Sequence, residues 1–345
     1  MTLSSGDVKS EATITLGESV GDSGAAIEGR SLGAIAWRRL RRDPVAMVSM
    51  GFIIFVLLVA ILAPLIIRAW GLDAYAQYKT EASPDNGYLP WGCIPGDHSI
   101  CTGHITWQHP LGIEPGIGRD VFARLLTGAR ISLFIALSAT VVSIVIGTVM
   151  GMLAGFRGGW LDGFVGRSMD LLLAFPQLIL LISLTPIMQN FMEKRLHMPE
   201  GNPTRITYLI VFIGFLGWPY FGRIIRGQTL SLREREFVEA ARSLGAGTGH
   251  ILFRQLLPNL WASILVYSSL VIPAYIATEA ALSYLGVGVL PPTPTWGTML
   301  ADSARLAIAD PAYLAIPGLS LFLIVLAFNL LGDALRDVLD PKSNR

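Results

Sequence analysis

Long apolar stretches alternate with short polar ones along most of this chain. A helix needs about 20 apolar residues to cross a bilayer, and six segments reach or approach that length: Val45–Ile67, Ile131–Phe156, Leu171–Met192, Ile206–Gly222, Leu256–Thr278 and Pro311–Gly332. The fourth is the shortest and is expected to borrow flanking residues. Because lipid offers no water to exposed backbone groups, each segment is predicted to be a helix. The pattern predicts an all-α polytopic membrane protein with six transmembrane helices.

Composition supports this class. Of the 345 residues, 52% are hydrophobic and only 15% are charged, and the mean hydropathy is +0.55. A soluble domain of this size needs more charge to cover its surface. The net charge of +1 gives no reason to expect a nucleic-acid partner.

Lysine and arginine gather on one side of the predicted bundle, and such residues favour the cytoplasmic side of a membrane. With the N-terminus inside, 17 of the 26 fall on that side: Lys9, Arg30, Arg38, Arg39, Arg41, Arg42, Arg157, Arg167, Arg223, Arg226, Arg233, Arg235, Arg242, Arg254, Arg336, Lys342 and Arg345. The sequence therefore predicts a multi-pass protein of the cell membrane with both termini in the cytoplasm.

The polar segments divide the chain further. Residues 1–30 lack the apolar core of a signal peptide and are expected to be a disordered cytoplasmic tail. Residues 31–44 read either as an amphipathic helix on the inner surface, with Trp37 and Leu40 toward lipid, or as a simple positively charged stop. The first span covers 45–68, and an extracellular segment follows over 69–117. The core takes up 118–340, beginning with an interfacial helix over Gly118–Arg130, and 341–345 form a tail.

The extracellular segment contains the only two cysteines of the chain, Cys93 and Cys101. Disulfides persist outside the cell, so the two are predicted to form one local bridge; a pair of free buried thiols is the alternative. With His98 and His104 they could also suggest zinc. The spacing is not that of a common zinc module, and no metal site is predicted.

Catalytic motifs are missing from the sequence. No lysine follows a glycine, so there is no phosphate-binding loop of the Gly-Lys type, and neither His-Glu-x-x-His nor Gly-x-Ser-x-Gly occurs. Charge within the spans is sparse, with Glu279 as the best candidate for a group that couples transport to an ion. These absences predict a protein that is no enzyme and binds no cofactor itself. If it moves a solute uphill, the energy comes from elsewhere.

The loop between the fourth and fifth spans, over 223–257, is the one sizeable cytoplasmic loop. Good helix formers run up to Gly245, two further glycines follow, and helix formers resume before Pro258. This order predicts a helix, a hinge and a second helix. Ala240 and Ala241 offer a flat surface for close approach of another protein, and Glu239 can pair with a cation there; the plain alternative for Glu239 is an ordinary solvated glutamate.

This loop resembles the E-A-A loop of importer-type ABC transporter permeases. The matching residues are Glu239, Ala240, Ala241, Gly245, Leu257 and Pro258, with Gln255 where the family has an apolar residue. Further blocks extend the resemblance over about residues 31–340: Gly118-Arg119-Asp120, Gly128-Ala129-Arg130-Ile131-Ser132-Leu133, Asp170 with Ala174-Phe175-Pro176, Glu279-Ala280-x-Leu282-Ser283-x-Leu285-Gly286-x-Gly288, and Pro291-Pro292-x-Pro294-x-Trp296-Gly297. Together they resemble the C-type permease of dipeptide, oligopeptide and nickel importers.

The resemblance implies the type I ABC importer permease fold with a cytoplasmic coupling helix. It implies a homologous second permease, two ATPase subunits or one fused tandem ATPase that bind ATP and Mg²⁺, and an extracellular solute-binding protein. Peptides would move inward by alternating access, with the six loop residues named above contacting the ATPase. Import of nickel or another small solute by the same machine is one alternative. A channel or scaffold without ATP coupling is another.

Candidate residues for the outer gate or the substrate path are Tyr275, Glu279 and Ser283. Glu279 could attract a peptide amino group, but a hydrogen bond to the turn over Ser283–Pro294 is the favoured reading. Asp170 is expected to pair with Arg167 or with another helix. Arg119 and Asp120 are expected to stabilise the start of a helix. Prolines that could kink spans are Pro176, Pro186, Pro219 and Pro273. The outer segment departs from the family in its length and over 112–117, which leaves the substrate open.

Overall fold

The computed structural model describes residues 37–78, 82–83, 89–90, 105–308 and 310–339. Its long helices are α2 (Pro44–Ala69), α3 (Val121–Arg157), α4 (Gly159–Ala174), α5 (Gln177–Arg195), α6 (Asn202–Leu232), α9 (Leu257–Tyr284) and α11 (Pro311–Leu339). Shorter elements are α7 (Glu236–Ser243), α8 (Thr248–His250), the π-helix η3 (Ile251–Leu256), α10 (Trp296–Ala304) and the strands β1 (Ala82–Ser83) and β2 (Leu89–Pro90). Five helices can span a membrane, or six spans if α4 and α5 count as one, which confirms the helical membrane class.

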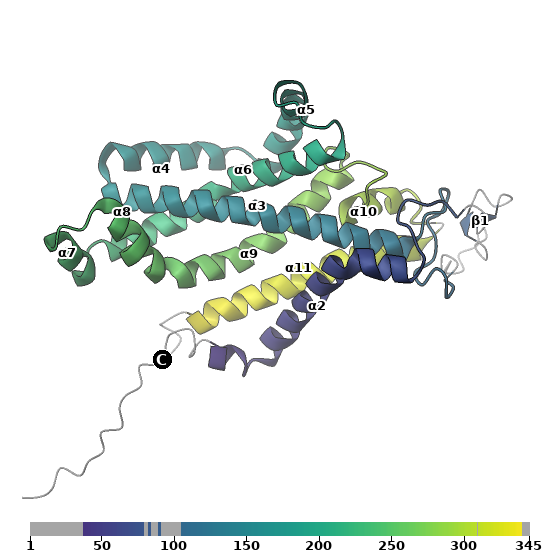
Figure 1. The fold of residues 1–345 in the computed structure, drawn as a ribbon, viewed down its shortest axis with the longest axis horizontal. Helices are drawn as coiled ribbons and strands as arrows, with labels where there is room; N and C mark the ends of the chain where they lie inside the picture. The colour runs from purple at the N-terminus through teal and green to yellow at the C-terminus, as the bar shows by residue number, and fades with distance from the viewer. Residues whose placement is uncertain (1–36, 79–81, 84–88, 91–104, 309, 340–345) are drawn as a thin grey trace, which may run out of the picture.

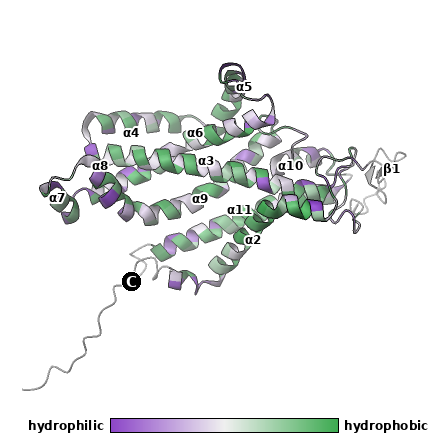
Figure 2. Cartoon of the chain, viewed as in Figure 1, coloured by the Kyte–Doolittle hydropathy of each residue, from purple (hydrophilic) through white to green (hydrophobic). Residues whose placement is uncertain are grey.

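Helices α2, α3, α4, α6, α9 and α11 extend roughly along the longest axis of the molecule, whereas α5 projects away from them at 90° to α4 (Figure 1). Helices α7 and α8 lie at one end, and the start of α2 and the end of α11 point toward that end. Helix α10 and the strands lie at the other. Hydrophobic residues cover the long helices, whereas hydrophilic ones are frequent near α7 and α8 and near the start of α3 (Figure 2). We refer below to the α7 end and the α10 end.

The closest packing in the bundle is between α3 and α6. Three glycines of α3 follow one another at four-residue spacing, Gly147, Gly151 and Gly155. A Cβ added to Gly151 would lie 2.6 Å from the carbonyl oxygen of Gly222, and one at Gly155 would lie 2.8 Å from that of Arg226. Small residues at such positions let two backbones approach closely in a membrane, where the hydrophobic effect does not drive association.

The segment over Gly118–Arg130, predicted as an interfacial helix, does not form a helix of its own. Helix α3 begins at Val121 and continues without a break to Arg157, so this segment forms its first turns. Asp120 caps the helix, because its Oδ1 accepts a hydrogen bond of 2.6 Å from the Ala123 amide. The side chains of Ala123 and Leu126 are buried against the end of α2.

The third predicted span, Leu171–Met192, is not one continuous helix. Helix α4 ends at Ala174, α5 begins at Gln177, and their axes differ by 90°. Pro176 lacks an amide hydrogen and disfavours a helical conformation in the residue before it, and Phe175 is accordingly extended, with φ −95° and ψ 138°. The three other candidate prolines lie inside helices: Pro186 in α5, Pro219 in α6 and Pro273 in α9.

Two further expectations have mixed outcomes. The fourth span does extend beyond Ile206–Gly222, since α6 has 31 residues. Near the N-terminus, Trp37 is exposed as expected, but Leu40 is buried against Ala46 and Ala334 instead of facing lipid. The predicted tails over 1–30 and 341–345, and the predicted bridge between Cys93 and Cys101 with its neighbours His98 and His104, lie outside the described residues.

Candidate functional site: the Glu239–Pro258 loop

Helix α7 is held against the rest of its own chain by one apolar face. Val238 and Ala241 are buried there, in a cluster with Ile251, Leu252 and Leu256 at the base of α9. The acids in its first turn, Glu236 and Glu239, favour the positive end of the helix dipole. The loop is therefore packed on the start of α9 and is not a free tether.

Gly245 ends α7 with a regular stop signal. Its φ is +80°, a conformation that glycine adopts without strain. The Gly245 amide donates to the Arg242 carbonyl at 2.9 Å, and the Ala246 amide donates to the Ala241 carbonyl at 3.0 Å. This is the Schellman pairing, which satisfies the last carbonyl groups of a helix. The predicted order of helix, hinge and helix is confirmed.

We expect Gly245→Ala to loosen the end of α7. No atom lies within 4 Å of a Cβ at this position, so the cost comes only from the left-handed backbone and is about 1–2 kcal/mol. The measurement is amide hydrogen exchange over α7, which should speed up. Gly249→Ala is the matched control, because Gly249 also has open space around it but lies in α8 at an ordinary φ. Equal exchange in the two variants would contradict the backbone explanation.

Glu239 and Ala240 of α7 and Leu244 directly after it are exposed, whereas Arg242 stacks on Phe156 of α3, with its Cζ 5.0 Å from the ring centroid. The flat pair expected at Ala240 and Ala241 is only half exposed, because Ala241 is buried in the chain itself. Leu244 was not among the sequence candidates, yet it is 88% exposed at the tip of the helix. Its position directly before the glycine stop, with an apolar side chain, was the available signal.

Beyond the hinge the chain enters α9 through the π-helix η3. Pro258 stands in the first turn of α9 and is exposed, and Leu257 before it is half-buried. In an α-helix a proline ring crowds the carbonyl four residues earlier. The wider π-turn, with the Leu257 amide donating to the Leu252 carbonyl, relieves this crowding. Leu257 and Pro258 thus connect the loop to a spanning helix.

The predicted gate residues lie inside the bundle. Glu279 is fully buried, and Tyr275 and Ser283 are 5% and 3% exposed. The Ser283 hydroxyl donates to Glu279 at 2.8 Å and accepts from the Val289 amide, and the Tyr275 hydroxyl donates to Ser143 at 2.9 Å. In this structure none of the three side chains faces an open path. The favoured interpretation of Glu279 was a hydrogen bond to the backbone of the turn over Ser283–Pro294. The observed partner is the hydroxyl of Ser283 in that turn.

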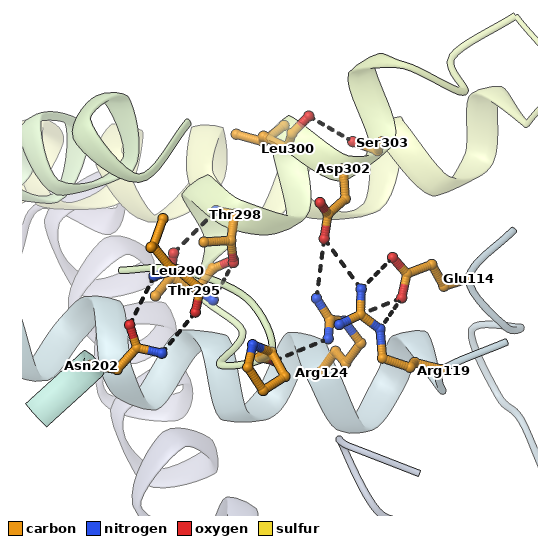
Figure 3. A network of polar contacts seen from close by, with 11 residues as sticks. Glu114, Arg119, Arg124, Asn202, Leu290, Thr295, Thr298, Leu300, Asp302 and Ser303 are labelled. Carbon is orange, nitrogen blue, oxygen red and sulfur yellow. Dashed lines mark hydrogen bonds and ion pairs between the residues drawn. The ribbon is translucent and has the colours of Figure 1, made fainter. Parts of the chain in front are cut away.

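A buried charge network joins three segments at the α10 end (Figure 3). Arg119 binds Glu114 through two nitrogens, with Nη2 to Oε1 at 2.6 Å, and both Arg119 and Arg124 reach Asp302 of α10 at 3.4 Å. The Arg124 side chain has no exposed surface, and that of Glu114 is 2% exposed. Arg119 was expected to stabilise a helix start; instead it closes this network, which we call the α10 clamp.

Burial shapes the ionisation of the clamp and its neighbour. The pKa of Asp302 is raised, because desolvation and the nearby Glu114 carboxylate oppose its ionisation more than the two arginines favour it. Desolvation also raises the pKa of Asp120, although the carboxylate accepts from the Ala123 amide and contacts His109 Nδ1 at 2.7 Å. The Asp120 carboxylate is fully buried, whereas the Asp302 side chain keeps 27% of its surface exposed.

Asp170 forms an ion pair with a residue of another helix, which was one of the two partners expected for it. Its partner is Arg223 of α6. The seam between α4 and α6 contains a second ion pair nearer the α7 end. There, Asp162 of α4 binds Arg226 of α6, with Oδ2 and Nη2 2.7 Å apart. No group of three or more potential metal ligands occurs within the part of the chain that the structure describes.

Comparison with known proteins gives a consistent result. Residues 147–345 match the family model of the binding-protein-dependent transport system inner membrane component, and residues 31–90 match that of the N-terminal TM domain of oligopeptide transport permease C. The chain is 39% identical over 306 residues to the glutathione transport system permease protein GsiD of Salmonella paratyphi A, covering 89% of each chain. The GsiD protein of Escherichia coli O6:K15:H31 is 38% identical over the same coverage. Among solved structures, a chain of the inward-facing MetNI methionine ABC transporter aligns with a TM-score of 0.49 and 20% identity, over 63% of this chain and 97% of that one.

Proposed function

The chain belongs to the family of binding-protein-dependent transport system inner membrane components and is a permease subunit of an ABC importer; we propose that it moves di- or oligopeptides inward and is coupled to ATP hydrolysis through the Glu239–Pro258 loop. The observation that carries the coupling is the geometry of α7. Its inner face is packed on the start of α9, and its outer face presents Glu239, Ala240 and Leu244 at the end of the bundle. A force applied to α7 is thereby passed to a spanning helix.

The α7 end is the cytoplasmic end in this proposal. Arginines concentrate there, and the start of α2 and the end of α11 point the same way, so both termini are inside. Two ATPase subunits, or one fused tandem ATPase, dock on this side and bind the ATP and Mg²⁺. A homologous second permease completes the path, and an extracellular solute-binding protein delivers the substrate at the α10 end.

Transport would follow alternating access. Closure of the ATPase dimer carries α7 with it, and the buried contacts of Val238 and Ala241 transmit the movement to α9. The peptide substrate is supported by the oligopeptide permease model over 31–90 and by the glutathione transport named for the GsiD relatives, because glutathione is itself a tripeptide. This chain contributes the path and the coupling, and the partner subunits perform the hydrolysis.

Charge reversal at Glu239 tests the coupling. We expect Glu239→Lys to assemble normally but to reduce ATP-driven peptide uptake into proteoliposomes at least tenfold, because an exposed charge on the docking face is inverted. ATP hydrolysis should also lose its stimulation by peptide and binding protein. Leu244→Asp should give the same result, since it places a charge where an exposed apolar side chain would be covered.

Glu236→Lys is the matched control, because Glu236 is equally a first-turn acid of α7 and equally exposed but lies outside the E-A-A segment. It is expected to keep coupled uptake. Wild-type uptake by Glu239→Lys, or an equal loss in both charge reversals, would overturn the assignment of Glu239 to the docking face.

A further inference from the structure

One ion pair of the helix bundle stands open on its surface. Arg223 of α6 binds Asp170 of α4, yet the two side chains are 55% and 71% exposed. The neighbouring pair on the same seam, Asp162 with Arg226, is much more enclosed, at 23% and 32%. The clamp residues Glu114, Arg119 and Arg124 are almost fully buried.

The open pair lies within α6 and near the end of α4. Asp170 is eleven residues from the start of α4, which corresponds to ~16 Å, and Arg223 is nine residues before the end of α6, which corresponds to ~14 Å. Helix α6 is a candidate span. Charged side chains on spans are costly in lipid and almost always face protein or a water-filled cavity. The face that carries this pair is therefore not a lipid face.

The helix breaks next to the pair. Four residues beyond Asp170, α4 ends, and the chain turns by 90° through Phe175 and Pro176 before α5 begins. Irregular backbone at membrane depth is tolerated only where it is buried in protein or lines water. In transporters, discontinuous helices of this kind typically form substrate sites near the middle of the membrane. The exposed Asp170–Arg223 pair and the break between α4 and α5 therefore lie next to each other.

We propose that Asp170 and Arg223 line the translocation path and hold the two charged ends of a peptide in transit. The inference rests on the proposed function and assigns its substrate contact. The planar guanidinium of Arg223 suits a terminal carboxylate, which it can bind through two nitrogens, and the carboxylate of Asp170 suits a terminal ammonium group. In the empty path the two side chains neutralise each other. When a zwitterionic peptide arrives, the single Asp170–Arg223 pair is replaced by two pairs between protein and peptide. Each protein charge therefore keeps an oppositely charged partner throughout.

The test uses the complete importer in proteoliposomes, with its second permease, ATPases and binding protein. Three probes are compared: trialanine, N-acetyl-trialanine and trialanine amide. We expect Asp170→Asn to lower uptake of trialanine and of its amide about tenfold, as for the loss of one charge-assisted hydrogen bond, and to leave N-acetyl-trialanine unchanged. Arg223→Gln should spare only the amide. Each probe is compared between variants, so selection by the binding protein cancels.

Asp162→Asn is the matched control, since it removes the other carboxylate of the same seam. It is expected to change all three uptakes by the same factor. The same uniform change in Asp170→Asn would mean that the open pair is only structural and would overturn the proposal. A wild-type importer that takes up none of the three peptides would instead overturn the proposed function.

Charge-conserving variants cover the case in which a neutral variant does not assemble. Asp170→Glu and Arg223→Lys keep the pair but move its charges and, at Arg223, replace the fork by a point charge. Asp170→Glu should reduce uptake of trialanine at least threefold more than uptake of N-acetyl-trialanine. Arg223→Lys should reduce uptake of trialanine at least threefold more than uptake of trialanine amide. An equal reduction of both probes would overturn the proposal.

Discussion

Gly151→Leu is expected to leave little folded protein. Even a Cβ at this position would lie 2.6 Å from the Gly222 carbonyl oxygen and 3.0 Å from the Ile225 side chain. The obstacle is backbone, which cannot rotate away, so α3 and α6 must separate. Overpacking ordinarily costs about 1–3 kcal/mol, and we expect this change to reach or exceed the upper end because it disturbs the most extensive helix contact of the bundle. The measurement is the monodisperse yield after extraction from membranes.

The matched control is Gly227→Ala on α6. This glycine is exposed inside α6, five residues before the helix ends, and no atom lies within 4 Å of an added Cβ. Alanine there should be neutral or stabilise the helix by about 0.5–1 kcal/mol. A normal yield of Gly151→Leu would show that α3 and α6 can move apart without loss of the fold, and would contradict the role of the glycine row.

The glycine row could have been read from the sequence. Gly147, Gly151 and Gly155 stand in a Gly-x3-Gly-x3-Gly pattern inside the second predicted span, which is a known signature of close helix packing in membranes. Hydropathy alone located the spans but could not tell which face of each helix packs. It therefore predicted α3 as a membrane element and missed its closest neighbour, α6, whose contacting residues lie 71 positions later in the chain, as Gly151 and Gly222 do.

The two errors in helix boundaries have the same origin. Arg119, Arg124 and Arg130 made the segment before Ile131 look interfacial, because a local pattern cannot show that Glu114 and Asp302, far apart in the sequence, neutralise the first two. At Pro176 the apolar run continues through a helix break of 90°. Proline was recognised as a kink, but the sequence does not show that α4 packs along α3 and α6 while α5 leaves at 90°.

The Glu239–Pro258 loop was more predictable than the surroundings of Glu279 and Asp170. Gly245 adopts a left-handed backbone conformation, which a glycine after a run of helix formers already indicates. The residues before it favour a helix over any other local structure. The outward positions of Glu239 and Leu244 and the buried position of Ala241 depend instead on how α7 docks on α9. Glu279 stood out as a charge in a span; Ser283, one turn later, donates to one of its two carboxylate oxygens, and the other has no hydrogen-bond partner among the described residues. The exposed charge of Asp170 on α4 could be recognised as unusual only once the helix break beside it was known.

Glu114→Gln is expected to be the most destabilising single change at the α10 end. The α10 clamp balances two carboxylates, Glu114 and Asp302, against Arg119 and Arg124. Removal of the Glu114 charge leaves two buried guanidinium groups facing one carboxylate that is itself hard to ionise. Breaking a buried pair in this way costs about 3–5 kcal/mol, whereas the intact pair need not be strongly stabilising compared with apolar residues. The measurement is thermal unfolding in detergent.

Two further variants separate charge balance from the loss of a particular contact. Glu114→Gln combined with Arg119→Gln restores neutrality, so the double variant should be more stable than Glu114→Gln alone, with a coupling energy of about 1–3 kcal/mol. Glu234→Gln removes a carboxylate that pairs with Arg233 but is 70% exposed, and should cost under about 1 kcal/mol. If the double variant were less stable than Glu114→Gln by the full cost of a second lost contact, the clamp would act through packing and not through charge.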